Sequence, residues 1–386
     1  MLRFPDPLSF SKAEYYQFSP IPLPVAFKDA TGGFGEFAPL RGWLRVYDDE
    51  GYYGETFCSE NITETILPLV LTGKTKSHND WYTELYWKRR SYGFHNRHIA
   101  DLGQFDFIML EILARRAGMP LHRFLGAQKD WAAIYKTGGA ITLNDEALVA
   151  QMARYADEGY TTLKFKVGSD WGKNMRRDAR RIQKVRKAVG DNIAIAIDAN
   201  QVWDVNSALQ FADMIREYDI AWFEEPVDAN DMNAIRALKD NNIGIPLGFG
   251  ESMQNYHAFE TYVEKGVDHL IPLVGRINAM GDLLKIRHLS KQNGLQFSSG
   301  GMVYTNVAFG SLYDEDEMLE YNEPVFQTVG QFLEIKPEEK EGRMHIPDIT
   351  GSPIRLNFNK LEKCGYLEFK QYYSGESHKK QFAAWA

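Results

Sequence analysis

From about residue 130 onward, short apolar runs alternate with amphipathic stretches that have helical spacing. Eight apolar runs cover residues 133–139, 162–168, 193–200, 221–226, 246–251, 269–274, 296–301 and 318–321. Between them, apolar residues at helical spacing predict helices that include 147–158, 175–189, 207–218 and 280–291. Strands that alternate with helices pair in parallel. Eight such units in about 200 residues predict a closed α/β barrel of the TIM type.

The first 128 residues have a different pattern, which predicts a mixed α+β domain. Residues 43–47 alternate like a strand, residues 48–51 form a turn, and residues 52–57 make the return strand. Residues 99–117 have helical periodicity and end at a Gly-Met-Pro sequence that stops a helix. The residues after about 345 are too few for a domain, so we expect them to return and pack on the N-terminal unit.

Composition narrows the classes of protein. The 386 residues are 44% hydrophobic and 25% charged, with a net charge of −8, which excludes wholesale disorder and disfavours a nucleic-acid partner. The two cysteines, Cys58 and Cys364, predict reduced thiols in an intracellular protein. We find no signal-peptide layout and no apolar run near the ~20 residues that span a bilayer. We therefore expect a cytoplasmic protein without a membrane partner.

Charged residues stand at the carboxyl ends of four consecutive predicted strands. The second strand ends with Lys164 and Lys166, and the next three end with Asp198, Glu224 and Glu251. The three acidic residues are 26 and 27 positions apart, about one βα unit each. Barrel enzymes place their chemistry at this end of the strands, so these side chains should converge on one spot.

Three carboxylates in one water-poor pocket repel one another, and a divalent cation relieves that repulsion. Oxygen ligands without His or Cys favour Mg²⁺. Each acid alone is more often an ordinary strand-end residue or a helix cap; three in consecutive units favour a metal site. Lys164 and Lys166 are two positions apart and face the same way. Either they only neutralise the carboxylates, or Lys166, with its pKa lowered by the metal and Lys164, acts as a base.

Such a group fits one reaction type. A metal binds a substrate carboxylate and stabilises the enediolate that forms when a lysine removes the α-proton. The stretches that carry this chemistry are Lys164-Phe165-Lys166, Asp198-Ala199-Asn200, Phe223-Glu224-Glu225-Pro226 and Gly250-Glu251-Ser252. In order and spacing they resemble the enolase superfamily, in the group of mandelate racemase and muconate lactonizing enzyme.

The resemblance implies a fold and a set of roles. It implies an α+β capping domain over residues 1–128, a modified (β/α) barrel over 129–345 and a C-terminal segment, 346–386, that returns to the capping domain. It further implies a homo-oligomer and a small carboxylate substrate such as a sugar acid. The implied site residues are Asp198, Glu224 and Glu251 for Mg²⁺, Lys166 as base, Lys164 as its electrostatic neighbour, and Glu320, Asn200 and Tyr304 for substrate binding. Glu320 is equally well explained as a salt-bridged or solvated glutamate.

Two positions depart from the family pattern. Leu273 stands on the sixth strand where relatives carry an Asp or Lys, and Gly300 stands on the seventh near the position of a His. No ordinary acid or base therefore faces Lys166 from the opposite side. The nearby polar residues are His269, Arg276, Ser299 and Tyr304, and each is more often structural than catalytic.

Racemisation needs proton transfer on both faces of the substrate, so these departures favour one-sided chemistry. The first expectation is a syn dehydration of a sugar acid, in which Lys166 removes the α-proton and then protonates the leaving hydroxyl. An isomerase, cycloisomerase or epimerase with an atypical second acid is the alternative. A barrel that binds metal and acid sugars without turnover is a third, of another class.

Overall fold

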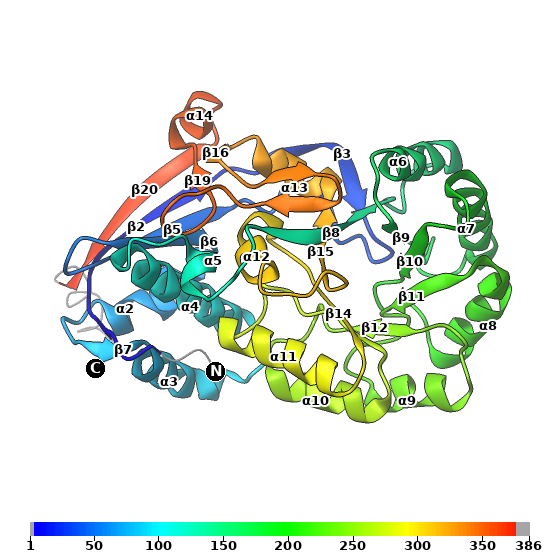
Figure 1. The fold of residues 1–386 in the computed structure, drawn as a ribbon, viewed down its shortest axis with the longest axis horizontal. Coiled ribbons are helices and arrows are strands. Elements are labelled where there is room, and N and C mark those ends of the chain that lie inside the picture. The colour runs from blue at the N-terminus through cyan, green and yellow to red at the C-terminus, as the bar shows by residue number, and fades with distance from the viewer. Residues whose placement is uncertain (1–3, 376–386) are drawn as a thin grey trace.

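The computed structural model describes residues 4–375, and a closed barrel forms the right-hand part of the view in Figure 1. Each barrel strand is parallel to the next, and β15 pairs with β8 to close the ring. The barrel strands are β8 (Trp131–Gly138), β9 (Thr162–Lys166), β10 (Ala194–Asp198), β11 (Ile220–Glu224), β12 (Leu247–Phe249), β13 (His269–Leu270), β14 (Gln296–Ser299) and β15 (Met318–Asn322). The predicted fold class is therefore confirmed.

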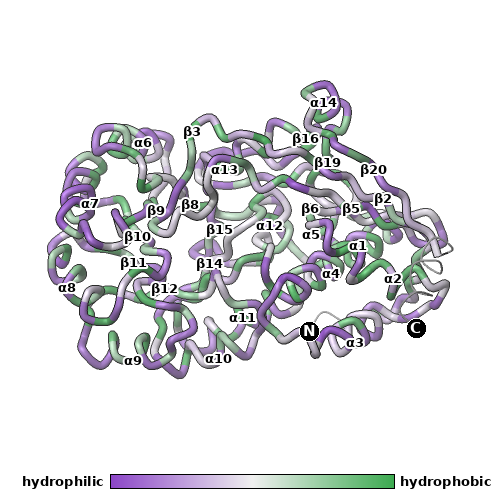
Figure 2. The backbone as a smooth tube through the Cα atoms, turned by 180° about the vertical axis from the view of Figure 1, so that it is seen from behind, coloured by the Kyte–Doolittle hydropathy of each residue, from purple (hydrophilic) through white to green (hydrophobic). Residues whose placement is uncertain are grey.

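Helices cover the outside of the barrel. They are α6 (Asp145–Asp157), α7 (Met175–Val189), α8 (Val205–Ile215) with the 3₁₀ turn η2 (Arg216–Tyr218), α9 (Met232–Asp240), α10 (Tyr256–Lys265), α11 (Met280–Gln292), α12 (Val303–Gly310) and α13 (Glu323–Gly330). In α7, the Asn174 side chain caps the first turn, and Ile182 and Val185 face the barrel. Most of the α7 backbone is coloured as hydrophilic in Figure 2, as expected for a helix with one buried stripe.

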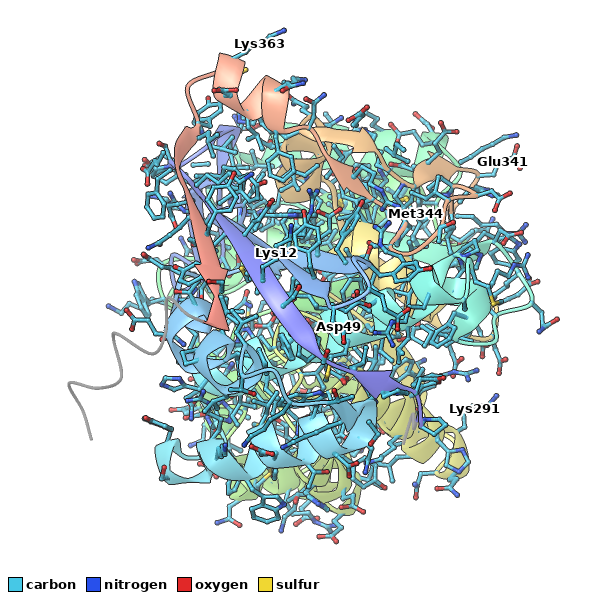
Figure 3. The ribbon with its side chains drawn as sticks, turned by 90° about the vertical axis from the view of Figure 1, so that its left-hand side faces the viewer. Lys12, Asp49, Lys291, Glu341, Met344 and Lys363 are labelled. Atoms are coloured by element: carbon cyan, nitrogen blue, oxygen red, sulfur yellow. The ribbon has the colours of Figure 1, made fainter. Side chains whose placement is uncertain are left out.

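The N-terminal region forms a separate layer beside the barrel. Its antiparallel sheet has the order β20-β2-β5-β6, from β2 (Phe10–Phe18), β5 (Gly42–Asp48), β6 (Tyr53–Cys58) and β20 (Leu367–Ser374). Figure 3 shows β20 beside β2, where Lys12 is labelled, so a C-terminal strand completes this sheet. The helices of this region are α1 (Asn61–Thr65), α2 (Leu67–Val70), α3 (His78–Arg89) with η1 (Arg90–Tyr92), α4 (Arg97–Arg116) and α5 (Leu121–Phe124).

The remaining elements connect or flank these two layers, and most of them are short. They are β1 (Pro7–Leu8), β3 (Pro22–Lys28), β4 (Phe34–Phe37), β7 (Lys76–Ser77), β16 (Leu333–Ile335), β17 (Glu338–Lys340), β18 (Arg343–His345), β19 (Arg355–Leu356) and α14 (Phe358–Lys363). The backbone N–H of Ile141 donates to the carbonyl of Lys28 at 2.7 Å, so the end of β3 is tied to the loop that follows β8. None of the helices within residues 4–375 is long and apolar enough to cross a membrane.

Helix α4 joins the two layers. It packs against β6 on one side and approaches the barrel loop at Ile277 on the other. A Cβ on Gly103 would lie 1.9 Å from the carbonyl oxygen of Ile277, so only glycine allows this approach. On the same helix, Asp106 accepts bonds from His78 and from the backbone N–H of Met280, both at 2.7 Å. These contacts hold the N-terminal layer against the barrel.

Seven of the eight predicted strands extend too far at their carboxyl ends, and only 318–321 stops one residue short, before the end of β15. The second and third predicted runs end at residues 168 and 200, whereas β9 and β10 end at Lys166 and Asp198. Beyond those points the chain turns sharply, with φ of 92° at Gly168 and 44° at Asn200. The division of the chain at residues 128 and 345 stays a prediction.

Candidate active site

Strand register brings the charged residues together at one mouth of the barrel. Asp198 on β10 lies level with Glu224 on β11 and with Lys166 on β9. Lys164 lies two residues before Lys166 on β9, so both side chains point into the barrel. Glu251 follows β12 directly after Gly250, whose φ of 141° turns the chain back into the mouth. The strand ends therefore meet as predicted from their spacing.

Asp198, Glu224 and Glu251 each offer a carboxylate oxygen, and these oxygens lie within 4.8 Å of one another. Asp198 and Glu224 are fully buried, and Glu251 is half-buried. Burial, and then the charges of Asp198, Glu320 and Glu251, raise the pKa of Glu224 to about 8 although Lys164 opposes them. Burial and Asp198 also raise the pKa of Glu251. An oxygen-only donor set under this repulsion fits a hard divalent cation.

Two buried ammonium groups partly balance this charge. The Nζ of Lys164 lies 2.8 Å from both carboxylate oxygens of Glu224 and 2.9 Å from Oε1 of Glu320. The Nζ of Lys166 donates to Oδ2 of Asp198 at 2.5 Å. Burial favours a neutral Lys166, but the charge of Asp198 outweighs it and raises the pKa. The sequence predicted a lowered pKa for Lys166 beside a metal ion. In the protein without a metal the pKa is raised instead, because Asp198 is the direct partner of Lys166.

Glu320 belongs to this group. Besides Lys164, its Oε1 accepts a hydrogen bond from the Thr137 hydroxyl at 2.8 Å. Burial alone would raise the pKa of Glu320, but Lys164 and Lys166 outweigh it and lower the pKa. Glu320 is therefore a salt-bridged carboxylate that also faces the mouth of the barrel.

Sequence reasoning missed two residues of this group. Thr137, on β8, holds Glu320, and the indole Nε1 of Trp222 donates to Oε2 of Glu224 at 3.1 Å. Both lie at inward-facing positions of their strands. The alternation of inward and outward positions along a strand also places Thr137 and Trp222 inward. Because both side chains are uncharged, the sequence alone did not mark them as part of a site.

Asn200 lies beside the three acids. Its backbone N–H donates to Oδ1 of Asp198 at 2.9 Å, and its side-chain Nδ2 donates to Oε1 of Glu251 at 3.3 Å. Its own Oδ1 is buried without a hydrogen-bond partner among the described residues. The Oδ1 of Asn200 is therefore a buried acceptor that is left unpaired beside the three acids.

The structure does not bring Tyr304 to this group. The Tyr304 hydroxyl lies 3.3 Å from that of Tyr321, which follows the inward-facing Glu320 on β15 and so faces outward. His269 lies at the amino-terminal start of β13, where its Nε2 contacts the Ser298 hydroxyl at 2.9 Å. The Ser299 hydroxyl contacts Asn306 and Tyr313, at 3.1–3.3 Å. Three of the four polar candidates for a second acid or base are thus engaged elsewhere, and only Arg276 is left.

Leu273 and Gly300 form an isolated bridge between adjacent strand ends. A Cβ on Gly300 would lie 2.5 Å from Cδ2 of Leu273 and 2.7 Å from Oε2 of Glu320. The space beside Gly300 is therefore already filled by its neighbours, and a side chain fits there only if they move.

Comparison with known proteins agrees with this geometry. Residues 147–360 match the family model described as "Enolase C-terminal domain-like". The chain is 27% identical to L-talarate/galactarate dehydratase of Salmonella typhimurium over 278 residues, which are 72% of this chain and 68% of that protein. It is 26% identical to arabinonate dehydratase of Saccharolobus solfataricus over 273 residues, 67% of this chain and 72% of that protein. It is 28% identical to D-Ala-D/L-Ala epimerase of Cytophaga hutchinsonii over 207 residues, 53% of this chain and 54% of that protein.

Solved structures share the whole fold. That of L-talarate/galactarate dehydratase from Salmonella typhimurium, liganded with Mg and L-lyxarohydroxamate, has a TM-score of 0.81 at 23% identity and covers 95% of each chain. That of 3,6-anhydro-D-galactonate cycloisomerase from Zobellia galactanivorans has a TM-score of 0.76 at 20% identity and covers 92% of this chain and 100% of that one. The chain belongs to the enolase superfamily, in the group of mandelate racemase and muconate lactonizing enzyme.

Proposed function

We propose that this protein is a Mg²⁺-dependent enzyme that removes the α-proton of a sugar acid and dehydrates it on one face. The observation that carries the proposal is the position of Lys166 beside the three carboxylates. Its one-sided form is supported by Leu273 and Gly300, which bring no acid or base to the described strand ends where they stand. Asp198, Glu224 and Glu251 would hold the cation. When bound, it would stabilise the negative charge that develops on the substrate carboxylate as the proton leaves.

Lys166 acts twice in this proposal. Its neutral Nζ accepts the α-proton, and the ammonium so formed donates that proton to the β-hydroxyl, which leaves as water on the same side. The product is an enol that becomes a 2-keto acid. Lys164 lies in the same group, and its positive charge acts to lower the pKa of Lys166. Release of Lys166 from Asp198 removes the interaction that raises this pKa.

Glu320 and Asn200 would orient the substrate. Glu320 is fixed by Lys164 and Thr137, so its remaining oxygen is available to the substrate. Asn200 offers its free Oδ1 as an acceptor for a substrate hydroxyl. Both residues would orient the substrate so that its α-carbon faces Lys166.

The test is a screen of acid sugars with Mg²⁺ for 2-keto acid formation, followed by two variants. Lys166→Ala should abolish product formation and α-proton exchange in deuterated water, yet retain Mg²⁺ binding. Lys173→Ala is the matched control, because this lysine is exposed in the loop after β9. Wild-type exchange rates in Lys166→Ala would contradict the assignment of the base.

A second pair of variants tests the metal site. Glu224→Gln should abolish Mg²⁺ binding measured by calorimetry. Glu225→Gln should retain it, because Glu225 is equally buried but its Oε2 accepts from Gln201 and it is not one of the three grouped acids. Equal Mg²⁺ affinity in Glu224→Gln and the wild type would overturn the proposed metal site.

Isomerisation is the second candidate, and the similarity to an epimerase and to a cycloisomerase favours it. It predicts that two α-epimers interconvert or that a product forms without loss of water. A barrel that only binds metal and acid sugars predicts neither keto acid nor solvent exchange. The homo-oligomer and the cytoplasmic location stay predictions.

A further inference from the structure

One side chain, that of Gln201, joins the chain segments that carry the three acids. Gln201 follows Asn200 in the turn after β10. Its Nε2 donates to Oε2 of Glu225 at 2.6 Å and to the hydroxyl of Ser252 at 3.0 Å. Its Oε1 accepts from the backbone N–H of Ala229 at 2.9 Å. A single amide group therefore ties the turn after β10 to the turns after β11 and β12.

The backbone at these contacts has an unusual conformation. Asn200, Gln201 and Glu225 have φ values of 44°, 68° and 39°, in the left-handed region that side chains other than glycine rarely adopt. Residues persist there only where the surrounding contacts hold them. The backbone N–H of Gln201 donates to the carbonyl of Glu225 at 2.7 Å, so both the backbone and the side chain of Gln201 hold this arrangement.

Glu251 is the acid that is held least directly. Asp198 and Glu224 each accept a short hydrogen bond from a buried lysine, at 2.5 and 2.8 Å. Among the described residues, the carboxylate of Glu251 accepts a hydrogen bond only from Nδ2 of Asn200, at 3.3 Å. Glu251 lies in an irregular turn between β12 and α10. The hydrogen bond to the hydroxyl of Ser252, the next residue, therefore helps to hold Glu251 beside the other two acids.

Divalent cations differ in how much movement of their ligands they tolerate. Mg²⁺ needs near-octahedral geometry with oxygens at about 2.0–2.1 Å, whereas Ca²⁺ accepts about six to eight oxygens at about 2.3–2.6 Å in flexible arrangements. Oxygens of the three acids lie within 4.8 Å of one another in this structure. A carboxylate that is free to move outward therefore weakens the binding of Mg²⁺ much more than that of Ca²⁺.

We infer that Gln201 is a positioning residue that sets the preference of the site for Mg²⁺ over the larger Ca²⁺. It does so by fixing Glu251 relative to the acids on β10 and β11. This inference rests on the metal site of the proposed function. The amide oxygen of Gln201 is already engaged by Ala229, so its effect on the cation is indirect.

The test compares the affinities for Mg²⁺ and for Ca²⁺ in wild type and in Gln201→Met, measured by calorimetry without substrate. Methionine keeps the length and the unbranched shape of glutamine but has no hydrogen-bond donor. The affinity for Mg²⁺ should fall by about 10- to 100-fold, as is typical when the support of a metal ligand is removed. The affinity for Ca²⁺ should change by less than about threefold. The ratio of the two affinities is decisive, because a partly unfolded variant would lose both equally.

Ser252→Ala removes only the hydrogen bond next to Glu251. It should shift the ratio in the same direction as Gln201→Met, and the two changes together should add little, because both break the same contact. Gln210→Met is the matched control, since Gln210 is exposed on α8, and it should leave both affinities unchanged. Circular dichroism checks that each variant is folded, and Ser252→Ala decides alone if Gln201→Met is not.

Equal losses of Mg²⁺ and Ca²⁺ affinity, or an unchanged ratio, would overturn the inference. If wild type forms no keto acid but the ratio shifts as expected, the proposed reaction is wrong and the role of Gln201 stands. If keto acid forms and the ratio stays at its wild-type value in the variants, the role of Gln201 is wrong and the reaction stands. A wild type that binds neither cation would contradict both.

Discussion

Glu224 should make the stability of the metal-free protein decrease as the pH rises. Its pKa is about 8 in the folded protein, against 4.5 when unperturbed, because of burial and the neighbouring carboxylates. Between these two values the folded state holds a proton that the unfolded state has released. The free energy of unfolding therefore falls with increasing pH across this window.

The net change in the free energy of unfolding is largest above pH 6.5, because below that pH the titration of His269 opposes that of Glu224. His269 has its pKa lowered by burial to about 3 from 6.5, so between pH 3 and 6.5 it makes stability rise with pH. It offsets Glu224 up to pH 6.5. From there to pH 8, one proton over 1.5 pH units corresponds to about 2 kcal/mol.

The assay is urea unfolding, followed by circular dichroism, at pH 6.5 and 8.0 with a chelator. The wild type should lose about 2 kcal/mol more than Glu224→Gln between these pH values. Glu146→Gln is the control, because the Glu146 side chain is 80% exposed. Saturating Mg²⁺ at pH 8 should restore about 2.7 kcal/mol to the wild type at a hundred times its dissociation constant, and nothing to Glu224→Gln. An equal pH dependence in wild type and Glu224→Gln would refute the reasoning.

Three further predictions concern the walls of the barrel. Gly300→Ala should cost about 1–3 kcal/mol of stability and lower activity, because its Cβ meets Leu273 and Glu320; Gly275→Ala, whose Cβ meets nothing closer than 3.7 Å, should do neither. Thr137→Val should raise the pKa of Glu320 and lower kcat/KM about 10-fold by removing the hydrogen bond at 2.8 Å, as steady-state kinetics against pH would show. His269→Asn should become about 2 kcal/mol more stable from pH 6.5 to 5, measured by urea unfolding, because it lacks the His269 contribution that cancels that of Glu224 in the wild type.

The barrel and its acidic group could be predicted because both depend on regular spacing. Parallel strands repeat after one βα unit, and inward positions recur every second residue. These two periods place Lys164, Lys166, Asp198 and Glu224 at one mouth from the sequence alone, and the register of β9, β10 and β11 agrees. The strand ends could not be predicted as well, since the turns after them depend on local backbone conformation, as at Asn200.

The position of the Tyr304 side chain could not be predicted from strand spacing, because Tyr304 lies beyond the end of a strand. It follows β14 by five residues, and on a loop it would have reached the barrel mouth. Instead the chain turns at Met302, with φ of 45°, and helix α12 begins at Val303. The helix then turns Tyr304 toward Tyr321 on the outer side of β15. The rise in the pKa of Lys166 could not be predicted from the sequence either, because it depends on the 2.5 Å contact between Lys166 and Asp198.

Among the described residues, the structure adds to the prediction that no second base stands at Gly300. In the sequence, Gly300 is only a missing side chain, and a neighbouring residue might have supplied the function. In the structure, the space that a side chain on Gly300 needs is occupied by Leu273 and Glu320. His269, the nearest imidazole on β13, lies at the opposite end of its strand and contacts Ser298. Lys166 stands directly beside the three carboxylates, so the proposed reaction takes up the α-proton and returns it at this one lysine.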